Sequence, residues 1–503
     1  MMGMDAEVEG LRVTVSRYFP VAKVLVNPFA VTFHVTPDPA SLDETFDRLR
    51  RELVPKNYIP SIVRENGGYV VHVQKRPEPR FRGVHVNFLL LLATIGTTSV
   101  AGAVNWASYA NVPLLAAGSF LYGVVSFTLP LLAILGAHEM GHYVMAKRHG
   151  VRASLPFFIP SIPPLGTFGA FISMRDPIPN RKALLEIGLA GPLIGFILAI
   201  PITVIGLFLT AADPRPPSVG GGGDIFSPSI LYGWMLNLFP NAMSDPFRRH
   251  PTAFAGWVGL FVTAINLLPA GQLDGGHVAR ALFGDRHKYL SWGAVLLLLA
   301  LGTVSASWFI FALIILLLGV RHPPPLNDVT KLSPSRQALG ALAIVILLIT
   351  FVPVPFITVP PQASFAFETA TAPHVPIDHL NQTIAHGGQG NIVLDVANTG
   401  NVPTTVRLEI HPQNLDRIGW TIRIANFTVY GDGASQNVTV APPGDVAFVS
   451  LNVTERAIVR LLVLVPASSA SATFTFVVRG EITEPNLRAP ILVSDVDINI
   501  IVT

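Results

Sequence analysis

The sequence predicts a polytopic α-helical membrane protein with a small N-terminal α+β domain and a C-terminal β-sandwich domain. Half of its 503 residues are hydrophobic and only 13% are charged, well below the roughly 25% that is typical of soluble proteins. Long apolar stretches recur between residues 87 and 353, whereas both ends of the chain are more polar. This excludes an ordinary cytosolic enzyme and a disordered chain. The expected domains are residues 1–86, 87–355 and 360–503.

The charge balance and the lack of cysteine narrow the possible partners and metal sites. The 34 basic and 31 acidic residues nearly cancel, so nothing argues for nucleic acid as a partner. A chain without cysteine forms no disulfide and no thiolate metal site. Histidine and carboxylate side chains must therefore hold any zinc ion.

The N-terminal region, residues 1–86, is rich in charge and has no apolar run long enough for a signal peptide. Residues 30–35 alternate like a strand, and residues 41–53 repeat apolar positions at helical spacing. Residues 69–73 form a second alternating run after a Gly-Gly turn. The pattern predicts a βαββ-like domain in the cytoplasm.

The central region predicts about seven membrane spans, because about 20 apolar residues are needed to cross the hydrocarbon core. The expected spans are residues 87–107, 116–147, 183–211, 252–270, 289–304, 306–320 and 336–353. Basic residues flank alternate ends of these spans, and such residues are typical of cytoplasmic loops. The N-terminus is therefore expected in the cytoplasm and the C-terminal domain outside it. The loop 212–250 is expected outside, with an amphipathic stretch at 230–239.

The C-terminal region, residues 360–503, contains no lysine and shows short alternating runs, such as 406–410 and 472–478. These runs predict a β-sandwich. Four Asn-x-Ser/Thr sequons agree weakly with an extracytoplasmic position, at Asn381, Asn426, Asn437 and Asn452. The domain either binds substrate ectodomains or is a passive glycosylated shield.

The second span ends in His138-Glu139-Met140-Gly141-His142. Residues four apart lie one turn above each other on a helix, so His138 and His142 can bind one metal ion. Glu139 lies near the same face, where it can accept a proton from water. A charged group among lipid tails costs about 2.5–3.5 kcal/mol, which favours a functional role. The alternative is a helix end whose polar side chains reach the membrane interface.

A zinc site needs a third protein ligand and an open position. Asp274 lies in the stretch 266–277, whose proline and three glycines predict a helix that unwinds at membrane depth. Asp274 is either the third ligand or only the N-cap of a following helix. Asn266 either donates to an oxyanion or satisfies unwound backbone. His277 is expected to support the site rather than to bind metal.

Three glycines of the third span, Gly188, Gly191 and Gly195, recur at three- and four-residue spacing. Small residues at this spacing let two membrane helices approach closely. The spacing therefore predicts a helix-packing face.

Two motifs together resemble the site-2 protease family of intramembrane zinc metalloproteases. They are the His-Glu-x-x-His of residues 138–142 and Asn266-x-x-Pro269-x-x-x-Leu273-Asp274-Gly275. The resemblance covers roughly residues 87–320 and is closest to the chloroplast and archaeal branch. It implies that His138, His142 and Asp274 bind Zn²⁺ and that Glu139 is the catalytic base. No PDZ-like insertion or appended nucleotide-binding domains accompany these motifs.

The resemblance implies an endopeptidase in the lipid bilayer that cleaves transmembrane protein substrates near the cytoplasmic side. Such a protease must hold its substrate in an extended form, which an exposed strand edge can do. The residues expected to form this edge and to bind substrate are Gly166, Thr167, Phe168, Gly169, Ala170 and Phe171. The alternative for this segment is a re-entrant loop that fills the core.

Two other functions are compatible with the motifs. One is a membrane zinc peptidase of another type, with glutamate as its third ligand. The other is a non-catalytic protein that carries metal or binds transmembrane helices. The substrate, the trigger and the oligomeric state cannot be predicted from the sequence.

Overall fold

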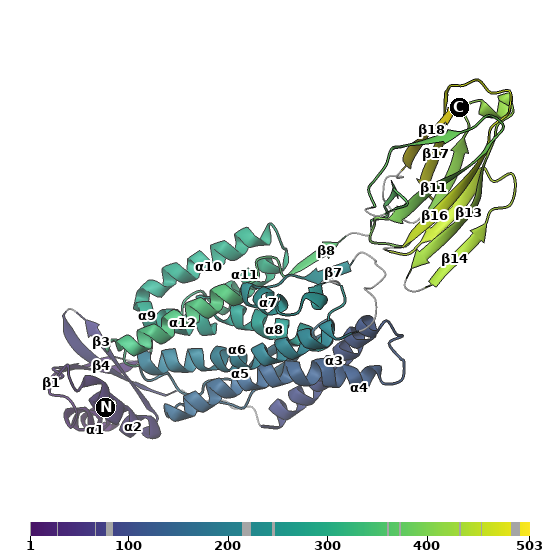
Figure 1. Cartoon of the computed structure of the whole chain (residues 1–503). Coiled ribbons are helices and arrows are strands. Elements are labelled where there is room, and N and C mark those ends of the chain that lie inside the picture. Colours follow the sequence, from purple (N-terminus) through teal and green to yellow (C-terminus); the bar gives the residue numbers. More distant parts are fainter. Residues whose placement is uncertain are drawn as a thin grey trace. The chain divides into compact units, whose positions relative to one another are not determined.

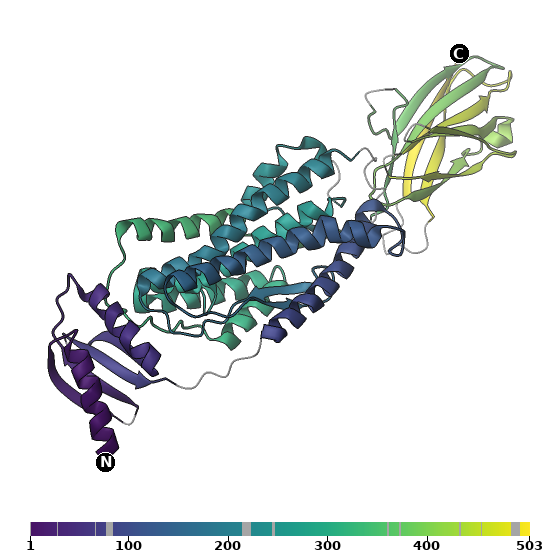
Figure 2. The ribbon, with the colours of Figure 1, turned by 90° about the horizontal axis from the view of Figure 1, so that it is seen from below.

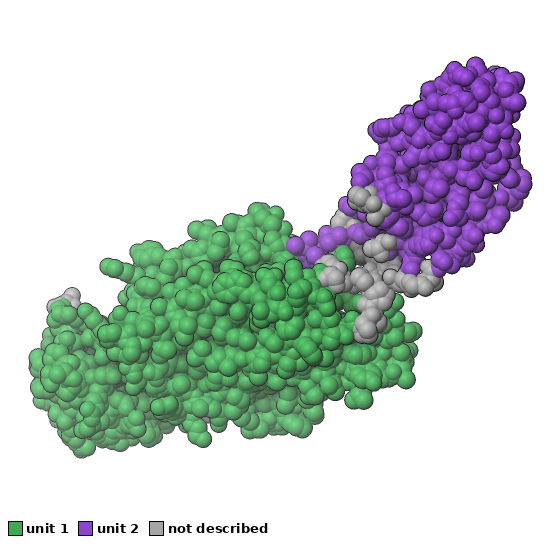
Figure 3. All heavy atoms as spheres, viewed as in Figure 1, with its two compact units in different colours: residues 1–213, 226–356 green, residues 214–225, 357–503 purple. Residues whose placement is uncertain are grey.

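The structure is a computed structural model of the chain (Figure 1). It describes residues 2–27, 29–65, 67–76, 84–213, 223–243, 247–359, 362–371, 374–431, 434–453, 455–483 and 493–503. The chain forms two compact units (Figure 3). The first comprises Met1–Asp213 with Phe226–Phe356, and the second comprises Pro214–Ile225 with Ile357–Thr503.

The first unit begins with an antiparallel four-stranded sheet in the order β1-β2-β4-β3. Its elements are α1 Met2–Ser16, β1 Val21–Asn27, β2 Ala30–Val35, α2 Leu42–Leu53, β3 Tyr58–Glu65 and β4 Gly68–Lys75. Both helices bury apolar residues against one face of the sheet, where Phe33 and Val71 are fully buried (Figure 2). The elements predicted at 30–35, 41–53 and 69–73 are present as β2, α2 and β4. Helix α1 and strand β1 were not predicted.

Helices occupy each of the seven positions where spans were predicted. They are α3 Val84–Ala110, α4 Ser119–Gly123 with α5 Leu129–Arg148, α6 Arg181–Ala211, α8 Pro251–Asn266, α10 His287–Gly302, α11 Ser307–Leu318 and α12 Pro334–Thr350. A π-helical turn joins α4 to α5, so Ser119–Arg148 is continuous. Two shorter helices, α7 Ile230–Leu236 and α9 Asp274–Phe283, complete the set.

Three helices among the described residues are long and apolar enough to cross a membrane: α3, Ser119–Arg148 and α6. Helices α8 and α10 have 16 residues each, and 16 residues rise only about 24 Å against a hydrocarbon core of about 30 Å. Length and composition therefore support three crossings among the described residues, and the other four of the seven expected spans stay a prediction.

Helix α6 occupies the centre of the helical core and packs against α5, α8 and α9 (Figure 1). It starts after Asn180, whose side-chain oxygen accepts a hydrogen bond from Ala183 N–H and so caps the first turn. Where α6 crosses α8, a Cβ atom at Gly206 or Gly256 would overlap the facing helix. These glycines allow the two backbones to approach closely.

A β-hairpin of β5 Phe157–Pro160 and β6 Thr167–Phe171 lies between α5 and α6 in the sequence. Three polar side chains of α3 donate hydrogen bonds to its backbone carbonyls. Asn87 donates to Leu155 O and Pro156 O, Thr97 to Gly166 O, and Asn105 to Pro164 O. Helix α3 therefore fixes the position of the hairpin.

The second unit is a pair of five-stranded sheets that enclose one apolar core. The sheet orders are β10-β18-β17-β12-β15 and β14-β13-β16-β11-β9. The strands are β9 Phe365–Glu368, β10 His379–Ile384, β11 Gln389–Asn398, β12 Thr404–His411, β13 Thr421–Gly431, β14 Ala434–Thr439, β15 Val446–Leu451, β16 Arg456–Leu464, β17 Thr473–Ile482 and β18 Val493–Val502. A short sheet of β7 Gly223–Phe226 and β8 Phe356–Val359 precedes it.

Candidate metal centre

Helix α5 carries three buried polar residues, His138, Glu139 and His142, on a helix that is otherwise largely apolar. The two histidines are one turn apart, and their Nε2 atoms lie 3.1 Å from each other. Their rings are edge to face, with centroids 4.9 Å apart. The helical spacing therefore brings both imidazoles to one point, as the sequence predicted.

Asp274 reaches the same point from a distant part of the chain. Helix α8 ends at Asn266, and α9 begins at Asp274 itself. A Cβ atom at Gly275 would overlap the carbonyl of Leu267, so only glycine lets α9 start this close to the end of α8. The Oδ2 atom of Asp274 lies 3.2 Å from the Nε2 atom of each histidine. No N-cap hydrogen bond from a side chain is made at this helix.

The three donor atoms fit a zinc ion. In a tetrahedral site with Zn–N bonds of 2.0–2.1 Å, neighbouring donors are about 3.3 Å apart, close to the 3.1 and 3.2 Å measured between these atoms. His142 Nδ1–H donates to Ile187 O at 2.7 Å, which leaves its Nε2 lone pair free to bind metal. Two imidazole nitrogens and one carboxylate oxygen this close to one another favour a shared cation.

The glycines of α6 lie against this site. A Cβ atom at Gly191 would overlap the imidazole of His142, and one at Gly188 would meet His277. At Gly195 the nearest atoms, those of His138, lie 3.2 Å away. From the sequence, this spacing indicates helix packing first, with a role in catalysis as the lesser alternative. The glycines also leave room for the histidine rings. This second role can be seen only when α5 and α6 are known to be neighbours.

A cavity of about 590 Å³ opens onto His138, His142 and Asp274. Glu139 lines it, with its carboxylate 4.0 Å from His138 Nε2 and facing the backbone N–H of Ile172. The Asn266 amide nitrogen lies 3.3 Å from His138 Nε2. His277 also lines the cavity, and its Nδ1 lies 3.0 Å from Leu273 O.

The predicted strand is present as β6, but only its end reaches the cavity. Ala170 and Phe171 line the cavity, followed by Ile172, Ser173 and Met174, which sequence reasoning did not single out. The rest of the predicted edge has other surroundings. Gly166 packs against α3, Thr167 is buried and donates to Ile159 O, Phe168 is exposed, and Gly169 has a positive φ.

The second unit holds another group of possible metal ligands, Glu368, His374 and Asp395, with donor atoms within 4.8 Å of one another. Arg456 already pairs with Asp395 at 2.7 Å and with Glu368 at 3.5 Å. Burial raises the pKa of Asp395, and the Arg456 charge opposes that rise. An ion-pair network accounts for this group.

Residues 126–306 match Peptidase family M50. The chain is also similar to two proteins of Arabidopsis thaliana. It is 35% identical to "Probable zinc metalloprotease EGY1, chloroplastic" over 46% of this chain and 44% of that protein. It is 31% identical to "Probable zinc metalloprotease EGY2, chloroplastic" over 44% of this chain and 40% of that protein. The matches thus span less than half the length of these curated relatives.

Among solved structures, the PapD-like domain 7 of human CEP192 matches 29% of this chain and 90% of that domain, with 10% identity and a TM-score of 0.17. A likeness this low carries no argument about function. The family match instead covers α5, α8 and α9, which supply the buried histidines, glutamate and aspartate described above. The core of this chain, residues 126–306, is therefore similar to peptidase family M50, and the curated plant relatives that it resembles are named as probable zinc metalloproteases.

Proposed function

We propose that the protein is a zinc-dependent intramembrane endopeptidase that cleaves transmembrane segments of membrane proteins near the cytoplasmic side. The observation that supports this most is the convergence of His138, His142 and Asp274 beside Glu139 in one cavity of the helical core. The third donor is an aspartate, which argues against the alternative of a zinc peptidase with a glutamate ligand.

Each residue of the site then has a distinct role. A zinc ion held by His138, His142 and Asp274 supplies Lewis-acid polarisation of a carbonyl group and acidifies water. Glu139 accepts a proton from the attacking water and returns it to the leaving amine, because its carboxylate faces the cavity beside the ligands without being one of them. The Asn266 amide is placed to donate a hydrogen bond to a developing oxyanion.

The free edge of β6 is the proposed binding site for extended substrate. Ser154 N–H donates to Ser173 O, and Arg175 N–H donates to Arg152 O, so residues 173 and 175 face the strand that leads into β5. Backbone groups alternate in direction along a strand, so those of Ala170 and Ile172 face the other way, toward the cavity. A substrate strand that pairs there lies beside Glu139.

An Ala170→Pro variant is expected to lower kcat/KM for a transmembrane substrate by about tenfold or more and to retain its zinc. Proline removes the N–H donor of residue 170 and its ring obstructs pairing at that edge. Ala170→Ser keeps the donor and serves as the control, with cleavage near the wild-type level. Unchanged cleavage by the proline variant would exclude strand pairing at this residue.

The two terminal domains are proposed to lie on opposite sides of the membrane and to have different roles. Basic residues at alternate helix ends support a cytoplasmic position for residues 1–86 and a position on the other side of the membrane for residues 360–503. Lys147 and Arg148 end α5 just beyond His142, which supports cleavage nearer the cytoplasmic side. The outer domain is then positioned to meet the ectodomains of substrates.

Metal removal from the full chain in liposomes tests the function. We expect about one zinc ion per chain, and cleavage of a tagged single-span substrate that a chelator stops and added zinc restores. Zinc binding without cleavage of any transmembrane substrate would favour the alternative of a non-catalytic metal or helix-binding protein.

A further inference from the structure

The segment between α11 and α12 forms part of the catalytic cavity and also touches the N-terminal sheet. His322, Pro323, Pro324 and Pro325 line the cavity together with the end of β6. Proline has no N–H and a fixed φ, so residues 323–325 form a stiff wall that donates no backbone hydrogen bond to an extended peptide. Residues 322–325 are here called the proline wall. The wall confines a substrate on one side of the cavity, so the backbone N–H and C=O groups of that substrate must pair with β6.

The proline wall leads directly into contacts with the N-terminal domain. Leu326 is buried in the apolar core of that domain, and its carbonyl accepts a hydrogen bond from Ile62 N–H of β3 at 2.8 Å. Its N–H donates to Ile178 O, just before α6. The residue after the wall is thus held between the sheet and the membrane core.

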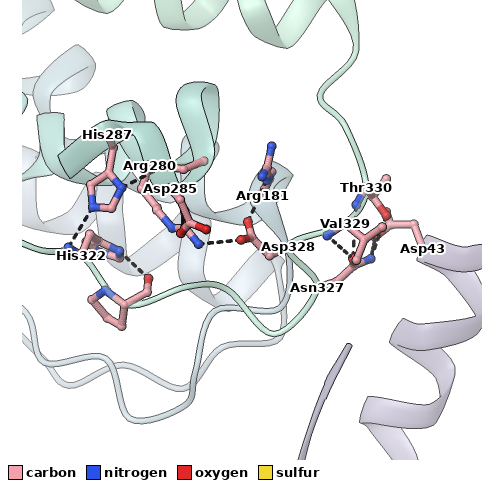
Figure 4. A network of polar contacts seen from close by, with 12 residues as sticks. Asp43, Arg181, Arg280, Asp285, His287, His322, Asn327, Asp328, Val329 and Thr330 are labelled. Carbon is pink, nitrogen blue, oxygen red and sulfur yellow. Dashed lines mark hydrogen bonds and ion pairs between the residues drawn. The ribbon is translucent and has the colours of Figure 1, made fainter. Parts of the chain in front are cut away.

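Asp43 of α2 binds the side chain of the next residue, Asn327, which is fully buried. Asn327 N–H also donates to Pro179 O, and its side-chain amide to Thr330 Oγ1. The Oδ1 atom of Asp43 accepts a hydrogen bond from the side-chain amide of Asn327 at 3.0 Å (Figure 4). The same atom accepts a hydrogen bond from the side-chain amide of Asn180 at 3.1 Å. Both donors are neutral, so this junction requires an acceptor oxygen at residue 43 but no charge.

The same segment is also tied to the helix that carries a metal-binding residue. Asp328 pairs with Arg181 of α6 at 2.8 Å and with Arg280 of α9 at 2.5 Å (Figure 4). Arg280 is only 2% exposed, and α9 begins with Asp274. A continuous set of contacts therefore joins the N-terminal domain, the proline wall and the metal centre.

We propose that the N-terminal domain positions the proline wall of the catalytic cavity, and that Asp43 is the positioning residue through which it acts. The inference rests on the proposed function, since the wall matters because it confines substrate. Asp43 does not line the cavity and takes no part in the chemistry. Loss of its acceptor oxygen frees the wall and weakens substrate binding, while Asp328 keeps α9 and the metal-binding residues in place.

Kinetics of the full chain test the effect on substrate. Asp43→Ala is expected to raise KM for a transmembrane substrate about tenfold, with kcat within about twofold of wild type and with unchanged zinc content. Asp43→Asn keeps the acceptor oxygen and should restore the wild-type KM. The matched control is Asp47→Ala on the same helix, because the partners of Asp47 among the described residues are Arg50 and Arg51 of α2. Equal KM values for the two alanine variants would overturn the proposal.

A thiol probe tests the position of the wall without reference to catalysis. The chain has no cysteine, so Pro325→Cys creates a single thiol at a buried wall position. We expect a maleimide to alkylate it about tenfold faster when combined with Asp43→Ala than when combined with Asp47→Ala or Asp43→Asn. Equal rates in all three backgrounds would overturn the proposal. A protein that binds zinc but cleaves nothing would overturn the proposed function alone, because alkylation does not depend on turnover.

Discussion

A Glu139→Gln variant is expected to cleave substrate at least about 10³-fold more slowly than wild type while it binds the same amount of zinc. A positioned general base contributes about 10²–10⁴-fold, and the glutamine amide has nearly the same shape but accepts no proton. The Glu139 carboxylate is not among the three clustered donors, so the metal site stays intact. Single-turnover cleavage in liposomes and metal analysis of the same sample measure both effects.

Glu186→Gln provides the matched control for this substitution. Glu186 lies on α6, outside the cavity, where it bonds His149 and Arg336. The same chemical change there should leave cleavage within a few-fold of wild type. Wild-type turnover by Glu139→Gln would remove Glu139 from the mechanism and with it the proposed assignment of the base.

A Gly191→Ala variant is expected to lose most of its zinc and to reduce cleavage by about 100-fold or more. The added methyl group would occupy the space of the His142 imidazole, so the ring must rotate away from His138 and Asp274. A site with only two protein ligands binds zinc far more weakly than one with three. Zinc content per chain and cleavage rate check the expectation.

Alanine substitutions at two other glycines should reduce the zinc content less than Gly191→Ala does. At Gly195 the nearest imidazole atoms lie 3.2 Å from an added Cβ, so a small shift of His138 should suffice and the loss of zinc should be partial. At Gly293 on α10 nothing lies within 4 Å, and zinc should be retained. Full zinc occupancy in Gly191→Ala would contradict the described packing of α6 against α5.

The cluster of candidate metal ligands could be predicted because its sequence signals are strong and partly local. His138 and His142 are related by one helical turn, and an acidic residue beside them in an apolar segment is expensive unless it has a function. Asp274 stood out for the same reason, because few acids lie among apolar residues in the central region. The closeness of Asp274 to the histidines of α5 could be known only from the fold.

Other parts of the site left no such signal. The role of Gly191 depends on which helix faces α6, and the role of Asp43 depends on a residue far away in sequence, Asn327. The run Pro323–Pro325 has an ordinary loop composition until its position in the cavity is seen. Likewise, apolar composition identified the short helices α10 and α11 but could not show whether they cross the membrane.

The hydrogen bonds from α3 to the β5–β6 hairpin set an order of assembly. The carbonyls of Leu155, Pro156 and Pro164, to which Asn87 and Asn105 donate, would lose these partners if the hairpin entered a hydrocarbon environment by itself, at a cost of several kcal/mol each. The hairpin is therefore expected to be stable in the membrane only when α3 is already there to donate these hydrogen bonds. Because α3 precedes the hairpin in the chain, synthesis from the N-terminus delivers these two parts in the required sequence.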